Sequence, residues 1–180
     1  MRKLQIGVMG SAADLNYKEE LEKIAERIGE LVAEKGCILF FGAEKDYYSL
    51  STAAAKGAKR KNGLVVGVTY GKRKKIVSAC ADIIIPTGLE RGGGREFVLS
   101  LCTDVIIAVG GGSGTLTEIA VAYQADIPVV VIEGTGGWSD KLAGTFLDGR
   151  QRQKSFSVKT PEEAVELAIG LAEKYSKKYG

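Results

Sequence analysis

DVIIAVGGGSGTLTEIA, residues 104–120, is the stretch that decides the fold. It begins with an apolar, β-branched run, passes through glycines at positions 110, 111, 112 and 114, and returns to helix-forming residues. A buried strand that leads through a glycine turn into a helix is typical of parallel α/β proteins. We therefore expect a strand over residues 104–109 and a helix over residues 116–124.

The alternation of strand and helix continues on both sides of this stretch. The other strand-like runs are continuous and β-branched, as expected for strands buried on both faces, and cover residues 4–9, 37–41, 64–69, 83–85 and 129–133, with an edge strand at 156–158. Helical patterns cover residues 17–35, 49–61, 96–102 and 161–177, and a glycine-rich loop follows residue 133. Right-handed crossovers then predict an α/β fold with a three-layer, Rossmann-like, doubly wound and mainly parallel sheet, built as one domain over residues 1–180.

The last predicted helix has a clear start. Thr160 is followed by Pro161 and, three positions after Thr160, by Glu163. Proline is favoured at the first helical position, and a threonine with a glutamate three residues later forms a capping box. We expect Thr160 and Glu163 to exchange hydrogen bonds at this helix end.

Composition excludes several classes of function. Hydrophobic residues make up 45% of the chain and charged residues 26%, and no apolar run is long enough to span a membrane. We expect no export signal, because the basic start leads straight into a strand pattern. The formal net charge of +3 predicts no nucleic-acid binding, and we interpret the basic run at residues 72–75 as a solvated face.

Metal and redox sites are also disfavoured. The chain has no histidine, and Cys37, Cys80 and Cys102 show no CxxC spacing. Three thiols in or beside apolar segments suit small buried side chains in a reducing compartment, so we expect a cytoplasmic protein without a zinc site or disulfides. We expect no metal and no cofactor.

The glycine turn predicts a phosphate site. Glycines permit positive φ and a close approach of backbone N–H groups to a ligand, and the helix that follows adds unpaired N–H donors and a partial positive charge. The turn lacks the lysine of a Walker A loop and the GxGxxG spacing of a dinucleotide fingerprint. The alternative is a tight strand-to-helix connection that holds no ligand.

The stretch from Arg95 to Glu118, REFVLSLCTDVIIAVGGGSGTLTE, resembles the signature of the Lonely Guy (LOG) cytokinin-activating phosphoribohydrolases. The 23-residue spacing of the arginine and the glutamate also matches that family. Four further segments are more similar to the molybdenum cofactor carrier-like proteins, a sister group: Met9-Gly10-Ser11, GLVVGVT (63–69), IPVVVIEGTGGW (127–138) and TPEEAV (160–165). The name lysine decarboxylase, also attached to this family, is rejected because such an enzyme needs a longer chain and usually a histidine.

The resemblance implies a Rossmann-like homodimer, or a higher homo-oligomer, that binds a small phosphorylated ligand. It implies phosphate binding at Gly111, Gly112, Ser113, Gly114 and Thr115. Gly10 and Ser11, at the end of the first strand, are further predicted ligand-binding residues. In the enzymes of the family, the residues matched by Arg95 and Glu118 serve hydrolysis of the N-glycosidic bond of a nucleoside 5′-monophosphate.

Two segments depart from the LOG pattern. The proline that precedes the turn in the enzymes is Gly110 here, a change that the carrier-like group shares. The loop after the second strand is usually GGG-type, whereas this chain reads FFGAEKDYYSLSTAA (40–54) and keeps only Gly42. Ligand specificity is expected to come from the loops at residues 42–50, 86–94 and 134–155.

Individual residues leave alternatives open. Thr115 and Glu118 fit a capping box, so Glu118 is either structural or functional; at a helix N-terminus its charged form would be favoured. Arg95 at a helix start opposes the helix dipole, which favours contact with a ligand or with Glu118. Ser11 is either a hydroxyl donor to the ligand or a structural cap.

Three functions therefore compete. The first is a carrier-like protein that binds a phosphate-bearing, nucleotide-like or pterin-type ligand at GGGSGT. The second is a phosphoribohydrolase that uses Glu118 and Arg95. The third is a subunit whose glycine turn serves only assembly.

Overall fold

The computed structural model describes residues 2–90 and 94–179 of the chain. Its centre is a seven-stranded sheet in the order β4-β3-β2-β1-β5-β6-β7, and every pair of neighbours in this part of the chain is parallel. The strands are β1 (Gln5–Gly10), β2 (Ile38–Gly42), β3 (Leu64–Thr69), β4 (Ile83–Pro86), β5 (Val105–Val109), β6 (Val129–Ile132) and β7 (Phe156–Val158). The doubly wound, Rossmann-like α/β fold is therefore confirmed.

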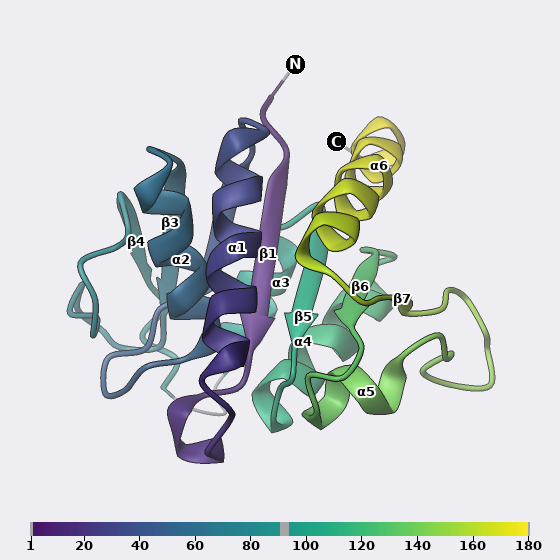
Figure 1. Ribbon diagram of the computed structural model, residues 1–180, viewed down its shortest axis with the longest axis horizontal. Coiled ribbons are helices and arrows are strands. Elements are labelled where there is room, and N and C mark those ends of the chain that lie inside the picture. The colour runs from purple at the N-terminus through teal and green to yellow at the C-terminus, as the bar shows by residue number, and fades with distance from the viewer. Residues whose placement is uncertain (1, 91–93, 180) are drawn as a thin grey trace.

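Helices cover both faces of the sheet and give three layers (Figure 1). One hydrophobic core lies between the sheet and α1 (Glu20–Glu34), α2 (Leu50–Arg60) and α6 (Pro161–Tyr179). A second core lies between the opposite face and α3 (Arg95–Leu101), α4 (Ser113–Gln124) and α5 (Gly137–Leu142). Strand β5 contributes side chains to both cores, because its five residues are all buried and point alternately to the two faces of the sheet. This explains why its sequence is continuously apolar.

Helices α1 and α2 approach each other through glycines. A Cβ atom at Gly29 would lie 1.8 Å from the carbonyl oxygen of Ala54, and one at Gly57 would lie 1.9 Å from that of Glu26. Any side chain at either position would collide with backbone, so the two helices touch directly there. This contact anchors one side of the β2 region.

Three element boundaries differ from the sequence expectation. The first helix begins at Glu20 rather than at residue 17, after a 3₁₀ turn, η1 (Ala13–Leu15). Helix α4 begins at Ser113 rather than at residue 116, and α5 occupies part of the predicted glycine-rich loop. The reason for α5 is that Asp140 accepts hydrogen bonds from the N–H groups of Gly134 (2.7 Å) and Gly136 (3.0 Å). These local bonds fold the loop back onto its own helix, and the positive φ angles of Gly134 and Gly136 permit it. The periodicity of apolar residues does not reveal such a turn.

The start of α6 follows the prediction. Thr160 Oγ1 accepts a hydrogen bond from the Glu163 N–H at 3.2 Å, and Glu163 Oε2 accepts one from the Thr160 N–H at 3.1 Å. The capping box read from TPEE is confirmed.

The strand order places the functional edge of the sheet. From β1 the chain moves outward through β2, β3 and β4, and then returns to β5 on the other side of β1. The loops after β1 and β5 therefore diverge and leave a crevice at the carboxyl ends of the strands, which point to the bottom of Figure 1. Within the described residues, no helix is long and apolar enough to cross a membrane.

Candidate functional site

A cavity of about 380 Å³ lies at this crevice. Its walls come from the ends of β1 and β2, the loop that follows β2, and the starts of α3 and α4. Gly10, Arg95 and Glu118, which are far apart in the sequence, all line it. The structure thus brings together the first strand end, the arginine and the glutamate that the sequence singled out.

The first half of the glycine turn is closed by the protein itself. Gly110 and Gly111 have φ angles of +66° and +105°, as the turn requires. The Gly110 N–H donates to Thr135 Oγ1 and the Gly111 N–H donates to Ser11 Oγ, both at 2.8 Å. The Gly111 carbonyl oxygen accepts from the N–H of Trp138 at 3.0 Å. These bonds tie the turn to β1 and to the start of α5.

Two predicted phosphate ligands are therefore placed differently from the expectation. Gly111 has its N–H occupied, and it does not line the cavity. Ser11 is 6% exposed and its hydroxyl accepts the Gly111 hydrogen bond, which is the structural alternative rather than the ligand-facing one. Sequence spacing could not distinguish these roles, because the bond joins residues 100 positions apart.

The second half of the turn is open. In the part of the chain that the structure describes, no acceptor is paired with the N–H groups of Gly112, Ser113, Gly114 and Thr115. The Leu116 N–H donates to the Gly112 carbonyl oxygen at 3.0 Å and begins the helical pattern. All four residues line the cavity, as does Gly10. An α-helix leaves its first N–H groups unpaired and carries a partial positive charge there, so this wall suits an anion.

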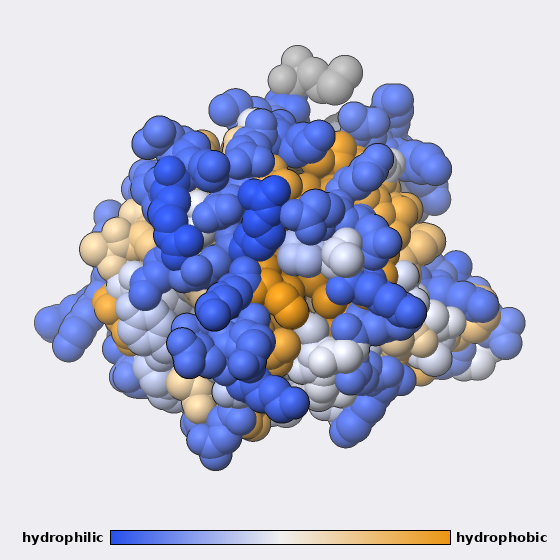
Figure 2. Space-filling view, in the orientation of Figure 1, coloured by the Kyte–Doolittle hydropathy of each residue, from blue (hydrophilic) through white to orange (hydrophobic). Residues whose placement is uncertain are grey.

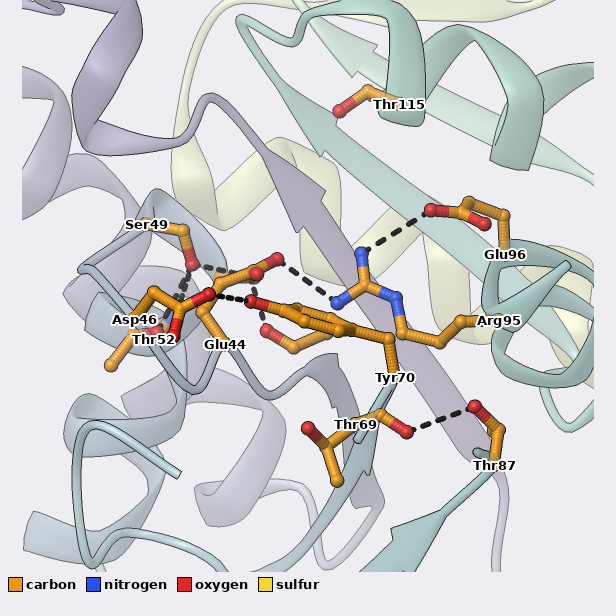
Figure 3. Close-up of polar contacts among 12 residues, drawn as sticks. Glu44, Asp46, Ser49, Thr52, Thr69, Tyr70, Thr87, Arg95, Glu96 and Thr115 are labelled. Atoms are coloured by element: carbon orange, nitrogen blue, oxygen red, sulfur yellow. Dashed lines mark hydrogen bonds and ion pairs between the residues drawn. The ribbon is translucent and has the colours of Figure 1, made fainter. Parts of the chain in front are cut away.

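Arg95 lies at the start of α3 and is 8% exposed. Its Nη1 is 2.9 Å from Glu44 Oε1, and its Nη2 is 3.5 Å from Glu96 Oε1 (Figure 3). Burial acts to lower the pKa of the guanidinium, but the charges of Glu44 and Glu118 outweigh it and raise this pKa. Arg95 is therefore a fixed cation held by carboxylates, and its buried Nε has no partner among the described residues.

Glu118 is 4% exposed and lies in the second turn of α4. Because α4 begins at Ser113, Thr115 is not the N-cap, and the capping-box role considered for Glu118 is wrong. Within the described residues, its carboxylate receives no hydrogen bond and forms no ion pair. Burial raises its pKa to about 8, with Arg95 acting to lower it and Glu96 and Glu44 acting to raise it.

This pKa reverses one expectation. The sequence placed Glu118 at a helix N-terminus, where its charged form would be favoured. In the structure burial outweighs the helix dipole, so Glu118 is mostly protonated at neutral pH and can donate a proton or a hydrogen bond into the cavity.

Sequence reasoning missed Glu44, Glu96 and Tyr70. Glu44 comes from the loop after β2, where the departure from the LOG pattern signalled a change but not its consequence. Tyr70 follows β3, donates to Asp46 and lies with its ring centroid 5.5 Å from Arg95 Cζ. For Glu44 and Tyr70 the available signal was their position just after strands, at the functional edge of a parallel sheet. Glu96 lies in α3 beside the predicted Arg95.

Other candidate features lie elsewhere or carry no site. Lys72, Arg73, Lys74 and Lys75 are exposed and do not line the cavity. The described residues contain no group of three or more acidic or cysteine side chains that could hold a metal ion. Residues 91–93, within the loop at 86–94 expected to set specificity, lie outside the described residues.

The sequence profile of the SLOG cluster4 family matches residues 3–165. The chain belongs to the SLOG cluster4 family. This finding supports the resemblance to LOG-like and molybdenum cofactor carrier-like proteins stated above.

Two solved structures share the fold of this chain over nearly their whole length. The molybdenum cofactor binding protein from Rippkaea orientalis is 31% identical, with a TM-score of 0.80 over 95% of this chain and 98% of that one. The molybdenum cofactor carrier protein from Chlamydomonas reinhardtii is 32% identical, with a TM-score of 0.79 over 96% and 99%. An uncharacterised protein of Archaeoglobus fulgidus is 42% identical over 89 residues, a match that spans 49% of this chain and 54%, about half, of that relative.

Proposed function

We propose that the protein is a carrier-like binding protein for a small ligand that bears a phosphate group, such as a nucleotide-like or pterin-type compound. The observation that carries this proposal is the presence, in one cavity, of four unpaired amide groups at the start of α4 and of four ionisable side chains that are buried or partly buried. We call Arg95, Glu44, Glu96 and Glu118 the Arg95 cluster.

The two walls of the cavity suit two ends of one ligand. A phosphate at the amides of residues 112–115 would accept charge-assisted hydrogen bonds in a site with a favourable dipole. The rest of the ligand would extend toward Arg95 and Glu44, from which Thr115 lies apart in Figure 3. A cavity of about 380 Å³ is within the range of small-molecule sites.

The structural relatives support a carrier role. Two proteins at about a third identity, named for binding or carrying the molybdenum cofactor, share the whole fold with this chain. We propose by analogy that this cavity holds its ligand for transfer, and that the protein works in the cytoplasm. The state of Cys37, Cys80 and Cys102, all free thiols, supports a reducing compartment.

Ligand binding is tested directly by thermal unfolding and calorimetry with AMP, GMP and inorganic phosphate. The proposal expects a melting temperature that rises with the concentration of at least one phosphate compound, because a ligand that binds only the folded state stabilises it. A melting temperature that stays the same with every phosphate compound would reject the proposal and favour a purely structural role for the glycine turn.

A second candidate function is a phosphoribohydrolase, favoured by one observation. Glu118 is a buried, largely protonated carboxylic acid that faces the cavity beside Arg95. Such an acid can donate its proton to the departing base while water adds to C1′ of the ribose and returns a proton to the carboxylate. The products would be the free base and ribose 5-phosphate.

A base-release assay separates the two functions. Purified protein is incubated with AMP and related monophosphates, and free base is measured by chromatography. Release that disappears in Glu118→Gln would establish the hydrolase. Binding without release, in the wild-type protein, supports the carrier.

We also propose a homodimer that pairs through α3. Phe97 and Leu101 on this helix are 53% and 58% exposed, and Leu89 beside it is 42% exposed. Large apolar side chains in one exposed patch are typical of an interface. Sedimentation of the wild-type protein and of Phe97→Glu tests this: we expect a dimer that dissociates in the variant, and a wild-type monomer would reject the interface.

A further inference from the structure

Glu44 lines the cavity but does not belong to the glycine turn. It follows β2, its side chain is 11% exposed, and it lines the cavity together with residues of α3 and α4. Its Oε1 lies 2.9 Å from Arg95 Nη1, closer than Glu96 Oε1, which lies 3.5 Å from Arg95 Nη2.

The Arg95 guanidinium is enclosed on several sides. Glu44 and Glu96 each contact one of its terminal nitrogens. Gly42 lies against it, since a Cβ atom there would be 3.3 Å from Nη1, and the Tyr70 ring lies 5.5 Å from Cζ. Figure 3 shows the guanidinium between the two carboxylates and above the Tyr70 ring. An anionic group of a ligand would have to displace a carboxylate to reach it.

The charges of the cavity are unequally distributed. Among the lining residues that the structure describes, four are acidic (Asp14, Glu44, Glu96 and Glu118) and one is basic (Arg95). Glu44 comes from the loop after β2, whereas Glu118 lies on α4 and Glu96 Oε1 is 4.0 Å from where a Cβ atom of Gly114 would be. The unpaired amides of α4 attract one anion, and the carboxylates that contact Arg95 repel a second anion there.

We propose that Glu44 determines ligand specificity by occupying Arg95. The cavity then accepts one phosphate, at residues 112–115, and a neutral or cationic group with N–H donors at the other end, while a ligand with anionic groups at both ends is excluded. The phosphate part of this statement rests on the proposed function; the role of Glu44 at Arg95 does not.

The test follows phosphate binding at each wall separately. In ¹⁵N-labelled protein, the backbone amides of Gly112 and Gly114 report on the α4 wall, and the Nε–H signal of Arg95, assigned by its loss in Arg95→Lys, reports on the other. Inorganic phosphate is titrated into the wild-type protein and into Glu44→Gln. Asp14→Asn is the matched control, because it removes one cavity charge without freeing Arg95.

We expect phosphate to shift the Arg95 signal in Glu44→Gln with at least a tenfold stronger apparent affinity than in the wild-type protein and in Asp14→Asn. An equal response in the wild-type protein, or an equal gain in Asp14→Asn, would overturn the role of Glu44. So would an Arg95 signal that stays unchanged in Glu44→Gln; Glu44→Ala is measured in its place if the first variant does not fold.

The two proposals fail in different ways. If the Gly112 and Gly114 amides never respond to phosphate but Arg95 responds in Glu44→Gln alone, the proposed phosphate site is wrong and the role of Glu44 stands. If the amides respond to phosphate but Arg95 does not respond in Glu44→Gln, the proposed phosphate site stands and the role of Glu44 is wrong.

Discussion

Charged side chains meet in two regions of this molecule, and the two groups differ in nearly every respect. On α1, α2 and α6 an exposed network joins seven side chains: Arg27, Arg60, Lys61, Glu26, Glu30, Glu34 and Glu162. Figure 2 shows the face to which α1 and α6 belong, where hydrophilic side chains predominate around a narrower hydrophobic strip. In the Arg95 cluster, by contrast, Arg95 and Glu118 are buried, Glu44 and Glu96 are only 11% and 13% exposed, and three carboxylates accompany one guanidinium.

The exposed network lies on the solvated surface of the helices, whereas the Arg95 cluster lines the cavity. Exposed ion pairs stay solvated, so they cost little and stabilise little. Buried ionisable groups lose hydration, and a cluster with excess carboxylates is not compensated by its own attraction. Replacing the whole Arg95 cluster with apolar side chains would therefore cost the fold little stability, which is why we assign the cluster to ligand binding.

The largest expected effect concerns the contact between α1 and α2, two of the helices that carry the exposed network. Gly29→Ala should lower the free energy of unfolding by at least about 4 kcal/mol, because its Cβ would lie 1.8 Å from the Ala54 carbonyl oxygen and force α1 away from α2. Urea denaturation measures the loss. Gly170→Ala in α6 is the control: nothing lies within 4 Å of its Cβ, so this change should stabilise by up to about 1 kcal/mol. Equal effects of the two substitutions would contradict the close α1–α2 contact.

The next effect breaks the Arg95 cluster. Arg95→Met removes the cation that Glu44 and Glu96 contact, and it should lower the free energy of unfolding by about 3 kcal/mol. Adding Glu44→Gln to this variant should recover part of the loss, since it removes one of the carboxylates that Arg95 contacts in the wild-type protein. A fully wild-type urea midpoint for Arg95→Met would show that the cluster is not desolvated.

The third effect is a pH dependence. Glu118 has a folded-state pKa of about 8, above the value near 4.3 expected in the unfolded chain, so the folded state binds its proton more tightly. This contribution to stability is fully present below about pH 4 and is lost as the pH rises toward 8. Between pH 5 and pH 7 the wild-type protein should lose about 2 kcal/mol relative to Glu118→Gln, measured by urea denaturation. Parallel pH profiles of the two proteins would refute a raised pKa.

The smallest effect belongs to the exposed network. Arg60 contacts Glu26 and Glu30, and its side chain is 50% exposed. Solvent screening reduces these contacts, so Arg60→Ala should cost less than about 1 kcal/mol, and less still in 1 M NaCl. A loss as large as that of Arg95→Met would erase the distinction between the two regions.

The fold could be predicted because its signals are local. Continuous apolar strands such as β5, glycine turns and the TPEE capping box each specify their own element, and right-handed crossovers then leave few topologies. The start of α4 was misplaced by three residues because Ser113 and Gly114 are poor helix formers that belong to the helix through its N-terminal geometry.

The site could be predicted only in part. Arg95, Glu118 and residues 112–115 do line one cavity, as their motif indicated. The hydrogen bond between Ser11 and Gly111 and the burial that raises the Glu118 pKa depend on long-range packing. The pairing of Glu44 with Arg95 joins residues 51 positions apart, and neither periodicity nor propensity encodes such a contact.

The central claim is that backbone amides at the start of α4 bind a phosphate, and one amide can be removed to test it. Ser113 is the first residue of α4 and follows an extended Gly112, so proline fits there without breaking the helix. Ser113→Pro deletes the N–H, whereas Ser113→Ala deletes only the hydroxyl.

Calorimetry with the phosphate compound that binds the wild-type protein most tightly measures the difference. A hydrogen bond to a charged group contributes about 1.5–3 kcal/mol, so Ser113→Pro should weaken binding at least about tenfold while Ser113→Ala stays within about threefold of the wild-type protein. Equal affinity in all three proteins would show that the phosphate does not bind at these amides.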